Sequence, residues 1–352
     1  MSFVGFPKIG QFNQAVRHVA DRTRYRGRDD NGEPIFDAEL PLPKLKLRGT
    51  VKVHGTNAGI RREAGKFICQ SRERDLPFPQ DNYGFRTWVD KFLSEEDNCI
   101  VKMFADVERI ATLQSVDFVD KQVTVFGEWA GNGVQTTVSV SEVGRFFYVF
   151  AAKVDEVWLD ISDLAEFPEE RIFNSERMKQ WELEIDFNDR LDLAKASEFM
   201  RNLTLEVEQL CPVGAALKNP KKEYKNTTGE GVVYKAADPA WSDLIFKVKG
   251  EEHSHSKVRT IAAVDVEKVE NAIKFTEYAV TENRLLRGVE ALKEAGKEVS
   301  KKSTGDFVAW MCRDCITEEA DTMKASGLDG KIVGNHIGTR AREWFFAYLD
   351  KV

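Results

Sequence analysis

The hydrophobic period of the chain becomes helical throughout near residue 258, and this change limits the folds that are open to it. In the first part, short runs with apolar residues at every second position alternate with turn residues, as in "LKLRGTVKV" and "KQVTVFGEWAG". From about residue 258 the apolar spacing is helical throughout. A sheet and a helical bundle each need a core of their own, so the sequence predicts two domains, 1–257 and 258–352.

The predicted elements of the first part follow from these runs. Strands are expected at 45–53, 58–63, 66–71, 121–131, 145–160, 229–236 and 243–252. Short connections between the first three favour antiparallel pairing. Helical spacing covers 84–111, with an interruption near Asp97-Asn98, and about 190–210. The face of the second helix is expected to contain Leu193, Ala196, Phe199, Met200, Leu203, Val207 and Leu210.

Composition excludes a few classes of protein. The formal charge of −7 over 352 residues disfavours a sequence-independent coat on nucleic acid, which needs clustered Lys and Arg. Five cysteines, an odd number without a framework spacing, indicate a reducing compartment. No apolar run has the length of a membrane span, and the first residues lack a signal-peptide pattern.

Lys52 stands at the end of an apolar strand, directly before the turn His54-Gly55-Thr56-Asn57. A lysine is a nucleophile only as the neutral amine, which burial and neighbouring cations favour. Lys247 and Lys249 are two residues apart on a predicted strand, so both point to one face and could also neutralise a triphosphate.

Two glutamates and one arginine complete the set. Glu128 in "FGEWAG" and Glu230 in "GEGVVYK" lie beside glycines, where a backbone can approach a ligand and a carboxylate can bind a sugar hydroxyl or a hydrated metal ion. Arg72 follows the third strand, where it could reach a phosphate or ribose. Each residue taken alone is more often structural. The order of all of them together indicates a site.

That order resembles a known family. "KVHGTN" is similar to the K-x-H-G-T-N signature of the ATP-dependent RNA ligases of the phage T4 RNA ligase 2 type, which include the kinetoplastid RNA-editing ligases. The resemblance covers about 46–257. It implies an α+β fold in which an antiparallel-sheet nucleotidyltransferase (adenylation) domain precedes a small all-helical C-terminal domain.

The resemblance also implies roles. Lys52 aligns with the lysine that is adenylylated, and Glu230, Lys247 and Lys249 with its catalytic partners, Glu230 binding the metal through water. The implied nucleotide contacts are Lys52, His54, Asn57, Arg72, Glu128, Phe150, Glu230, Lys247 and Lys249. Phe150 would stack on adenine. Two positions depart from the family pattern: Val51 replaces a glutamate before the nucleophile, and Ala151 an aspartate after Phe150.

The activity implied is sealing of 5′-phosphate and 3′-hydroxyl RNA ends, in RNA repair, with ATP as substrate and Mg²⁺ or Mn²⁺. The expected partners are ends in nicked or base-paired RNA, with no membrane and a monomeric chain. The expected compartment is the cytoplasm, which is that of the host if the protein is viral. An organelle is the alternative compartment.

Other interpretations stay open. A DNA ligase or a GTP-dependent capping enzyme usually has K-x-D-G, where this chain has His54, and an added β-barrel where this chain is helical. A non-catalytic nucleotide- or RNA-binding module would not need Lys52. Cys312 and Cys315 form a lone C-x-x-C, for which helix packing is favoured over zinc. For His253 and His255 a loop is favoured over a metal site. For "NPKKEYKN" at 219–226 a solvated loop is favoured over an RNA contact.

Overall fold

The computed structural model describes residues 3–250, 268–325, 327–328 and 330–351. The chain divides into two compact units, Met1–Gly250 and Glu251–Val352, and each is described by itself. The predicted boundary at 257/258, together with His253 and His255, lies outside the described residues and stays a prediction.

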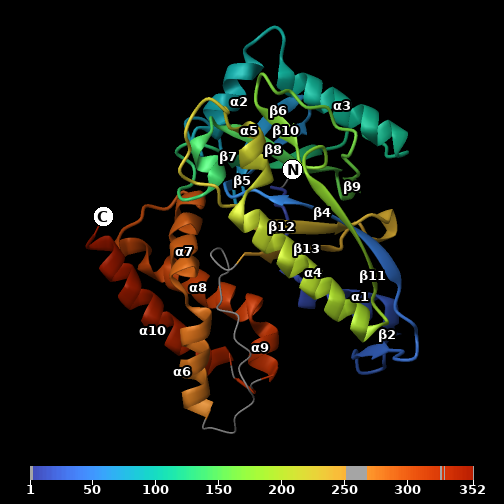
Figure 1. Ribbon diagram of the computed structural model, residues 1–352, viewed down its shortest axis with the longest axis vertical. Coiled ribbons are helices and arrows are strands. Elements are labelled where there is room, and N and C mark those ends of the chain that lie inside the picture. The colour runs from blue at the N-terminus through green and yellow to red at the C-terminus, as the bar shows by residue number, and fades with distance from the viewer. Residues whose placement is uncertain (1–2, 251–267, 326, 329, 352) are drawn as a thin grey trace. The chain divides into compact units, whose positions relative to one another are not determined.

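Two mixed sheets form the frame of the first unit (Figure 1). The first sheet has five strands in the order β1 (Gly10–Gln11), β13 (Ile245–Lys249), β12 (Gly231–Ala236), β4 (Lys44–Lys52) and β11 (Gln180–Asp186). The second has six, in the order β10 (Ile172–Asn174), β8 (Phe146–Val154), β7 (Val123–Ala130), β5 (Thr56–Glu63) and β6 (Lys66–Ser71), with β9 (Val157–Leu159) also on β8. A separate ribbon pairs β2 (Tyr25–Arg28) with β3 (Pro34–Phe36). The predicted α+β class with antiparallel sheets is confirmed, although β1–β13 and β10–β8 are parallel.

The predicted antiparallel pairing between the strands at 45–53 and 58–63, on either side of the turn after Lys52, is wrong. β4 pairs with β11 and β12 in the first sheet, whereas β5 pairs with β6 and β7 in the second. The link 53–55 is short, but it carries the chain from one sheet to the other instead of reversing it. The residues after Lys52 therefore lie where the two sheets meet.

The helices of the first unit are α1 (Phe12–Arg24), α2 (Phe85–Leu93), α3 (Cys99–Leu113), α4 (Arg190–Gln209) and α5 (Pro212–Leu217), with 3₁₀ turns at Ser139–Glu142 and Pro239–Trp241. The predicted interruption near Asp97-Asn98 is confirmed, because the Asn98 side chain caps α3 by accepting from the N–H groups of Ile100 and Val101. The predicted face of α4 is partly wrong. Phe199 and Leu210 are 43% and 56% exposed, since Phe199 is one residue, about 100°, from buried Met200 and Leu210 lies beyond the last turn.

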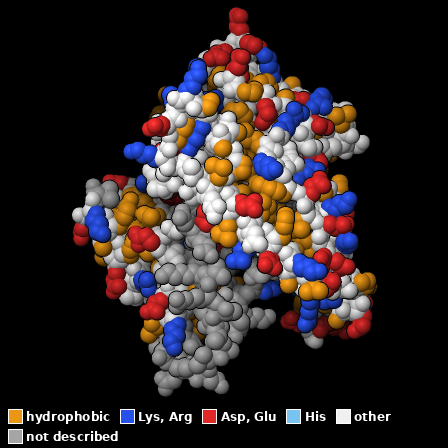
Figure 2. Space-filling model, in the orientation of Figure 1, with side chains coloured by type: hydrophobic (Ala, Val, Ile, Leu, Met, Phe, Trp, Pro, Cys, Tyr) orange, Lys and Arg blue, Asp and Glu red, His pale blue; other side chains and the backbone are white. Residues whose placement is uncertain are grey.

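Strand alternation divides the core of the first unit into two layers. Phe147 and Val149 of β8 pack with α2 and α3, while Phe146 and Tyr148 of the same strand pack with the first sheet and α4. Both faces of the second sheet are therefore buried around β8, which fixes its position firmly. On the face of the molecule in Figure 2, Lys and Arg side chains are interspersed with Asp and Glu.

The second unit is helical, as predicted, and its described residues contain no strand. It consists of α6 (Lys268–Ala279), α7 (Glu282–Glu294), α8 (Thr304–Glu318), α9 (Ala320–Ala325) and α10 (Gly330–Leu349), with a 3₁₀ turn at Lys301–Ser303. α6 and α7 are separate helices, because the chain breaks between them at Thr281, which caps α7 by accepting from the Arg284 N–H. Arg284 is fully buried and pairs with Asp314 and Glu319 at 3.1 and 3.0 Å.

Candidate active site

Lys52 is the last residue of β4, and the register of the first sheet determines its neighbours. Gly231 of β12 pairs with Lys52 on one side and with Lys249 of β13 on the other. In the next row on the same face, Val233 pairs with Lys247. Because side chains repeat their direction every second residue along a strand, the three lysines share one face of the sheet.

Glu230 joins several of these groups. Its Oε2 lies 2.6 Å from Nζ of Lys52 and 3.3 Å from Nδ1 of His54, and its Oε1 lies 2.8 Å from Nζ of Lys249. The carboxylate is only 2% exposed. Burial by itself would raise the pKa of Glu230, but Lys249, Lys52 and then His54 more than offset it and hold that pKa well below its usual value. Glu230 is therefore a buried carboxylate that stays ionised.

The backbone directly after Glu230 requires glycine. Gly231 has a φ of +149°, and a Cβ there would lie 2.2 Å from the carbonyl oxygen of Val248. With no side chain at this position, nothing stands in the row between Lys52 and Lys249. Both amines can therefore reach the same carboxylate.

A second glycine brings the turn after Lys52 against β7. A Cβ at Gly55 would lie 2.3 Å from the carbonyl oxygen of Trp129, so only glycine allows this approach. The Gly55 N–H donates to Oε1 of Glu128 at 3.0 Å. Glu128 is thereby held beside the turn that follows the nucleophile candidate.

Asn57 lies opposite Glu128 in the β5–β7 register. Its side chain is 5% exposed, and its Oδ1 accepts no hydrogen bond from any described residue. A buried amide oxygen without a partner costs about 1–3 kcal/mol. A donor group of a bound molecule would remove that cost.

Arg72 and Phe150 are carried by the second sheet. Arg72 is half-buried in the loop after β6, and within the described parts of the chain its side chain has neither a hydrogen bond nor an ion pair. The loop itself is anchored, because Arg61 contacts both carboxylate oxygens of Asp75 at 2.9 and 3.0 Å.

Phe150 is half-buried in β8, and a residue that the sequence analysis missed lies against it. The ring of Phe6 meets the Phe150 ring edge-on, with centroids 4.9 Å apart, and also contacts Phe126 and Trp158. The only signal in the sequence is the pair of aromatic residues in "FVGF", which is not specific.

The predicted site residues thus fall into three groups. Lys52, His54 and Lys249 contact Glu230 directly, and Lys247 shares their sheet face. Glu128 and Asn57 adjoin the turn after Lys52. Arg72 and Phe150 stand on strands of the second sheet or next to them.

Glu230 is the carboxylate that suits a divalent ion. The described residues hold no group of three or more His, Cys, Asp or Glu side chains with metal-ligand geometry. Mg²⁺ usually keeps several waters and takes one or two carboxylates together with substrate phosphates. The residues therefore fit a hydrated ion that enters with a nucleotide.

The two cysteines of the C-x-x-C sequence lie in the second unit. Cys315 is buried and the Cys312 Sγ donates to the Gly334 carbonyl at 3.4 Å, in line with helix packing.

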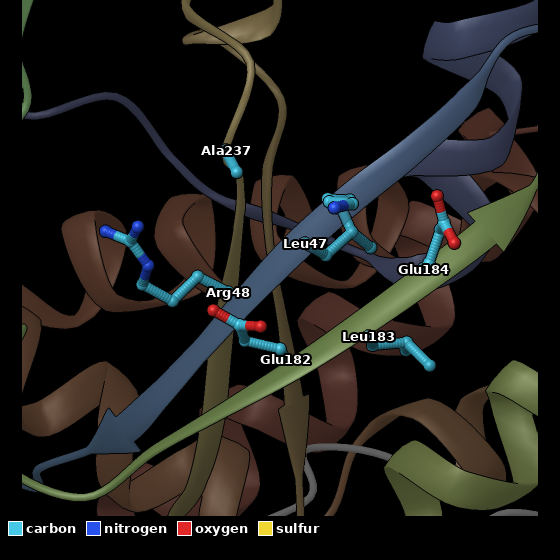
Figure 3. Close-up of a pocket in the computed structure, with 7 residues that line it drawn as sticks. Leu47, Arg48, Glu182, Leu183, Glu184 and Ala237 are labelled. Carbon is cyan, nitrogen blue, oxygen red and sulfur yellow. The ribbon is translucent and has the colours of Figure 1, made fainter.

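A pocket elsewhere on the first unit does not coincide with these residues. It lies over β4 and β11 and is lined by Lys46, Leu47, Arg48, Glu182, Leu183, Glu184 and Ala237 (Figure 3). None of the predicted site residues lines it.

No helix in the described ranges combines the length and the apolar character that a membrane crossing needs.

Comparison with known proteins identifies a family for most of the first unit. A family model described as RNA ligase matches residues 46–249, which include every predicted site residue. Among solved structures, "Naegleria gruberi RNA ligase with PPi" aligns at 12% identity and a TM-score of 0.39, over 72% of this chain and 57% of that one. A mutant of that ligase with AMP and Mn aligns at 12% identity and a TM-score of 0.41, over the same shares. The chain thus spans little more than half the length of these structures.

Proposed function

The chain belongs to the RNA ligase family, and on that premise we propose that it seals RNA ends with ATP through a Lys52-AMP intermediate. The observation that carries this proposal is the contact of Lys52 and Lys249 with buried Glu230, in the order and spacing of the family motifs. A chain that only binds nucleotide has no use for a lysine held at this point. The catalytic unit is 1–257, and 258–352 is a helical C-terminal domain.

In the first step the neutral amine of Lys52 attacks the α-phosphorus of ATP. A nitrogen–phosphorus bond forms, the bond to the β-phosphate oxygen breaks, and pyrophosphate leaves in line. The amine proton passes to solvent. Lys247 and Lys249 share the sheet face of Lys52, so they can neutralise the charge on the departing pyrophosphate.

The remaining residues of the set bind the nucleotide. The ring of Phe150 stacks on adenine, and Glu128 accepts a hydrogen bond from the ribose. Asn57 has a buried carbonyl oxygen that a donor on the nucleotide would satisfy. Arg72, half-buried and without a protein partner among the described residues, contacts a phosphate or the ribose.

Lys52 is the cationic partner of Glu230 in the described arrangement, whereas the attacking amine must be neutral. Glu230 must therefore be drawn away from Lys52 before the attack. A hydrated Mg²⁺ or Mn²⁺, when bound through Glu230, supplies charge neutralisation on the phosphates. His54 contacts the same oxygen of Glu230 as Lys52 does, at 3.3 Å, so it can hold this oxygen when Lys52 no longer does.

In the later steps AMP is transferred from Lys52 to the 5′-phosphate of one RNA end, and the 3′-hydroxyl of the other end displaces AMP. The substrate class is nicked or base-paired RNA, the setting is RNA repair in the cytoplasm, and the working chain is a monomer. The alternative within the superfamily is a GTP-dependent capping enzyme or a DNA ligase.

The test is covalent labelling. Pure protein is incubated with magnesium and α-phosphate-labelled ATP or GTP, denatured, and assayed for label and intact mass, with Lys52→Ala as the control. Acid-labile label from ATP alone, absent from the control, is the expected result. Label from GTP indicates capping. No label and no added AMP mass on the recovered protein would overturn the proposal.

The RNA substrate is tested with two matched nicks. The labelled enzyme is given a nicked RNA duplex and a nicked DNA duplex of the same sequence, each with a 5′-phosphate at the nick. Sealing of RNA at a rate at least tenfold above that of DNA is expected. Equal sealing of both would favour the DNA ligase alternative.

A further inference from the structure

Phe150 stands outside the strand register on both sides of β8. In the ladder with β7, Phe126 pairs with Ala151 and Gly127 with Val149, so Phe150 is the extra residue of a β-bulge. On the other side, β10 pairs with β8 only up to Val149. β9 pairs with it only from residue 152 onward. A bulge redirects a side chain, but it also leaves the backbone less constrained by its ladder.

Lys235 ties this bulge to the other sheet. It lies on β12 of the first sheet, five residues after Glu230, and its Nζ donates to the backbone carbonyl oxygen of Phe150 at 2.5 Å. One strand thus places both the carboxylate that contacts Lys52 and the amine that holds the Phe150 backbone. The position of Phe150 relative to Lys52 depends on this strand.

Glu176 fixes the amine of Lys235. Its Oε1 lies 3.2 Å from Nζ of Lys235, and its Oε2 lies 3.2 Å from Nη1 of Arg48 on β4, four residues before Lys52. The Glu176 side chain is 5% exposed, so its charge is directed to these two cations and little to water.

The backbone places Glu176 beside the bulge. The Ser175 N–H donates to the carbonyl oxygen of Val149 at 2.8 Å, which extends the β10–β8 pairing by one residue. The Glu176 N–H donates to Oδ1 of Asn174 at 3.0 Å. The carboxylate is therefore held where β10 ends and the bulge begins, and it links β4 and β12 with Phe150.

We propose that Lys235 and Glu176 are positioning residues for the nucleotide base: together they fix the bulge that aims the Phe150 ring. This inference rests on the proposed function, because it takes Phe150 as the ring that stacks on adenine. Neither residue touches the reacting atoms. Stacking is the same before and during the attack, so losing it raises the ATP concentration for half-maximal labelling and leaves the maximal rate unchanged.

The experiment measures single-turnover labelling of the full chain against ATP concentration. Lys235→Met is expected to raise the half-saturating ATP concentration about tenfold, with a maximal rate within twofold of the wild type. Lys235→Arg keeps a donor for both the Phe150 carbonyl and Glu176, so it should stay within threefold of the wild type. Glu176→Gln should change the half-saturating concentration in the same direction as Lys235→Met, by a smaller factor.

A double-mutant comparison separates positioning from general damage. In a Phe150→Ala background there is no ring to aim, so Lys235→Met should add less than a twofold change. A full tenfold addition would overturn the inference, as would an equal fall in maximal rate for Lys235→Met and Lys235→Arg. The control is Arg62→Met, which removes another half-buried cation, paired with Glu108 on the same unit; it should leave the ATP dependence unchanged.

A measurement of ATP binding without AMP transfer separates the test of the positioning role from the test of the ligase activity. ATP binding by calorimetry in a Lys52→Met chain should weaken about tenfold on adding Lys235→Met, and less than threefold on adding Lys235→Arg. If the wild type binds ATP but takes no label, the proposed ligase activity is wrong while the tenfold loss still supports the positioning role. Equal affinities with and without Lys235 would overturn the positioning role alone.

Discussion

Lys52 and Lys249 lie in one row of the first sheet, on either side of Gly231, and both amines contact the carboxylate of Glu230, at 2.6 and 2.8 Å. Two ammonium groups this close would repel each other without the carboxylate between them. Glu230 therefore has a stabilising role in the resting protein, besides any role toward a metal ion. Its two roles can be separated, because the first is measurable without nucleotide.

Glu230→Gln is expected to lower the free energy of unfolding by about 3–5 kcal/mol at neutral pH, since it leaves buried cations without their partner. The folded-state pKa of Glu230 lies below its ordinary value of 4.5. The stability from its ionised form is therefore complete above that value and is lost as the pH falls through the depressed folded-state pKa. Urea unfolding at several pH values should show that the free energy of unfolding of the wild type approaches that of Glu230→Gln only in acid.

The control for this measurement is Glu184→Gln. Glu184 pairs with Lys44 on the same unit, but their side chains are 47% and 58% exposed, so the change should cost less than about 1 kcal/mol at every pH. A gap between the wild type and Glu230→Gln that stays constant down to pH 3 would contradict the depressed pKa.

The parts of the fold that the sequence predicts are those with strong local signals. The strands around Lys52, Glu128 and Glu230 combine alternating apolar residues with glycines at fixed places, and the break between α2 and α3 is marked by the capping residue Asn98. The convergence of Lys52, Glu230 and Lys249 also follows from sequence, because a family order with known spacing implies it before any pairing is known.

Other features depend on partners far away in sequence and leave little local signal. β10 has three residues, β1 has two, and both pair parallel to distant strands. α1 differs from these strands, because Phe12, Ala15, Val16 and Val19 form a short apolar face at helical spacing, a local signal from which no helix was predicted. The separation of β4 and β5 into different sheets brings Gly55 against Trp129, and no pattern within 53–55 predicts this separation.

Gly55→Ala tests that close approach. A methyl group 2.3 Å from the Trp129 carbonyl must displace the turn or β7, so a loss of about 1–3 kcal/mol in unfolding free energy is expected. The shift also moves Glu128, so labelling with ATP should fall at least tenfold. The control is Gly305→Ala in α8, where a Cβ has open space; it should stabilise by up to about 1 kcal/mol.

The structural role of Glu128 and its role in nucleotide binding can be measured separately. Glu128→Gln keeps a side-chain oxygen that can accept from the Gly55 N–H, whereas Glu128→Leu does not. The glutamine variant should keep its thermal midpoint within about 2 °C of the wild type and raise the half-saturating ATP concentration several-fold. The leucine variant should lose both stability and labelling. Loss of stability in the glutamine variant would mean that the charge itself holds the turn.

Two arginines close in sequence should respond in opposite ways. Arg61 is 2% exposed and contacts Gln70 as well as both oxygens of Asp75, so Arg61→Met should cost about 3 kcal/mol of unfolding free energy. Arg72 stands in the loop that this contact anchors, and its side chain makes no ion pair or hydrogen bond with the described residues. Arg72→Met should therefore leave stability within about 0.5 kcal/mol of the wild type and lower labelling at limiting ATP at least tenfold. Chemical denaturation and labelling on the same preparations measure both effects. An Arg72 variant that is as unstable as the Arg61 variant would show that Arg72 supports the fold, and would remove it from the nucleotide site.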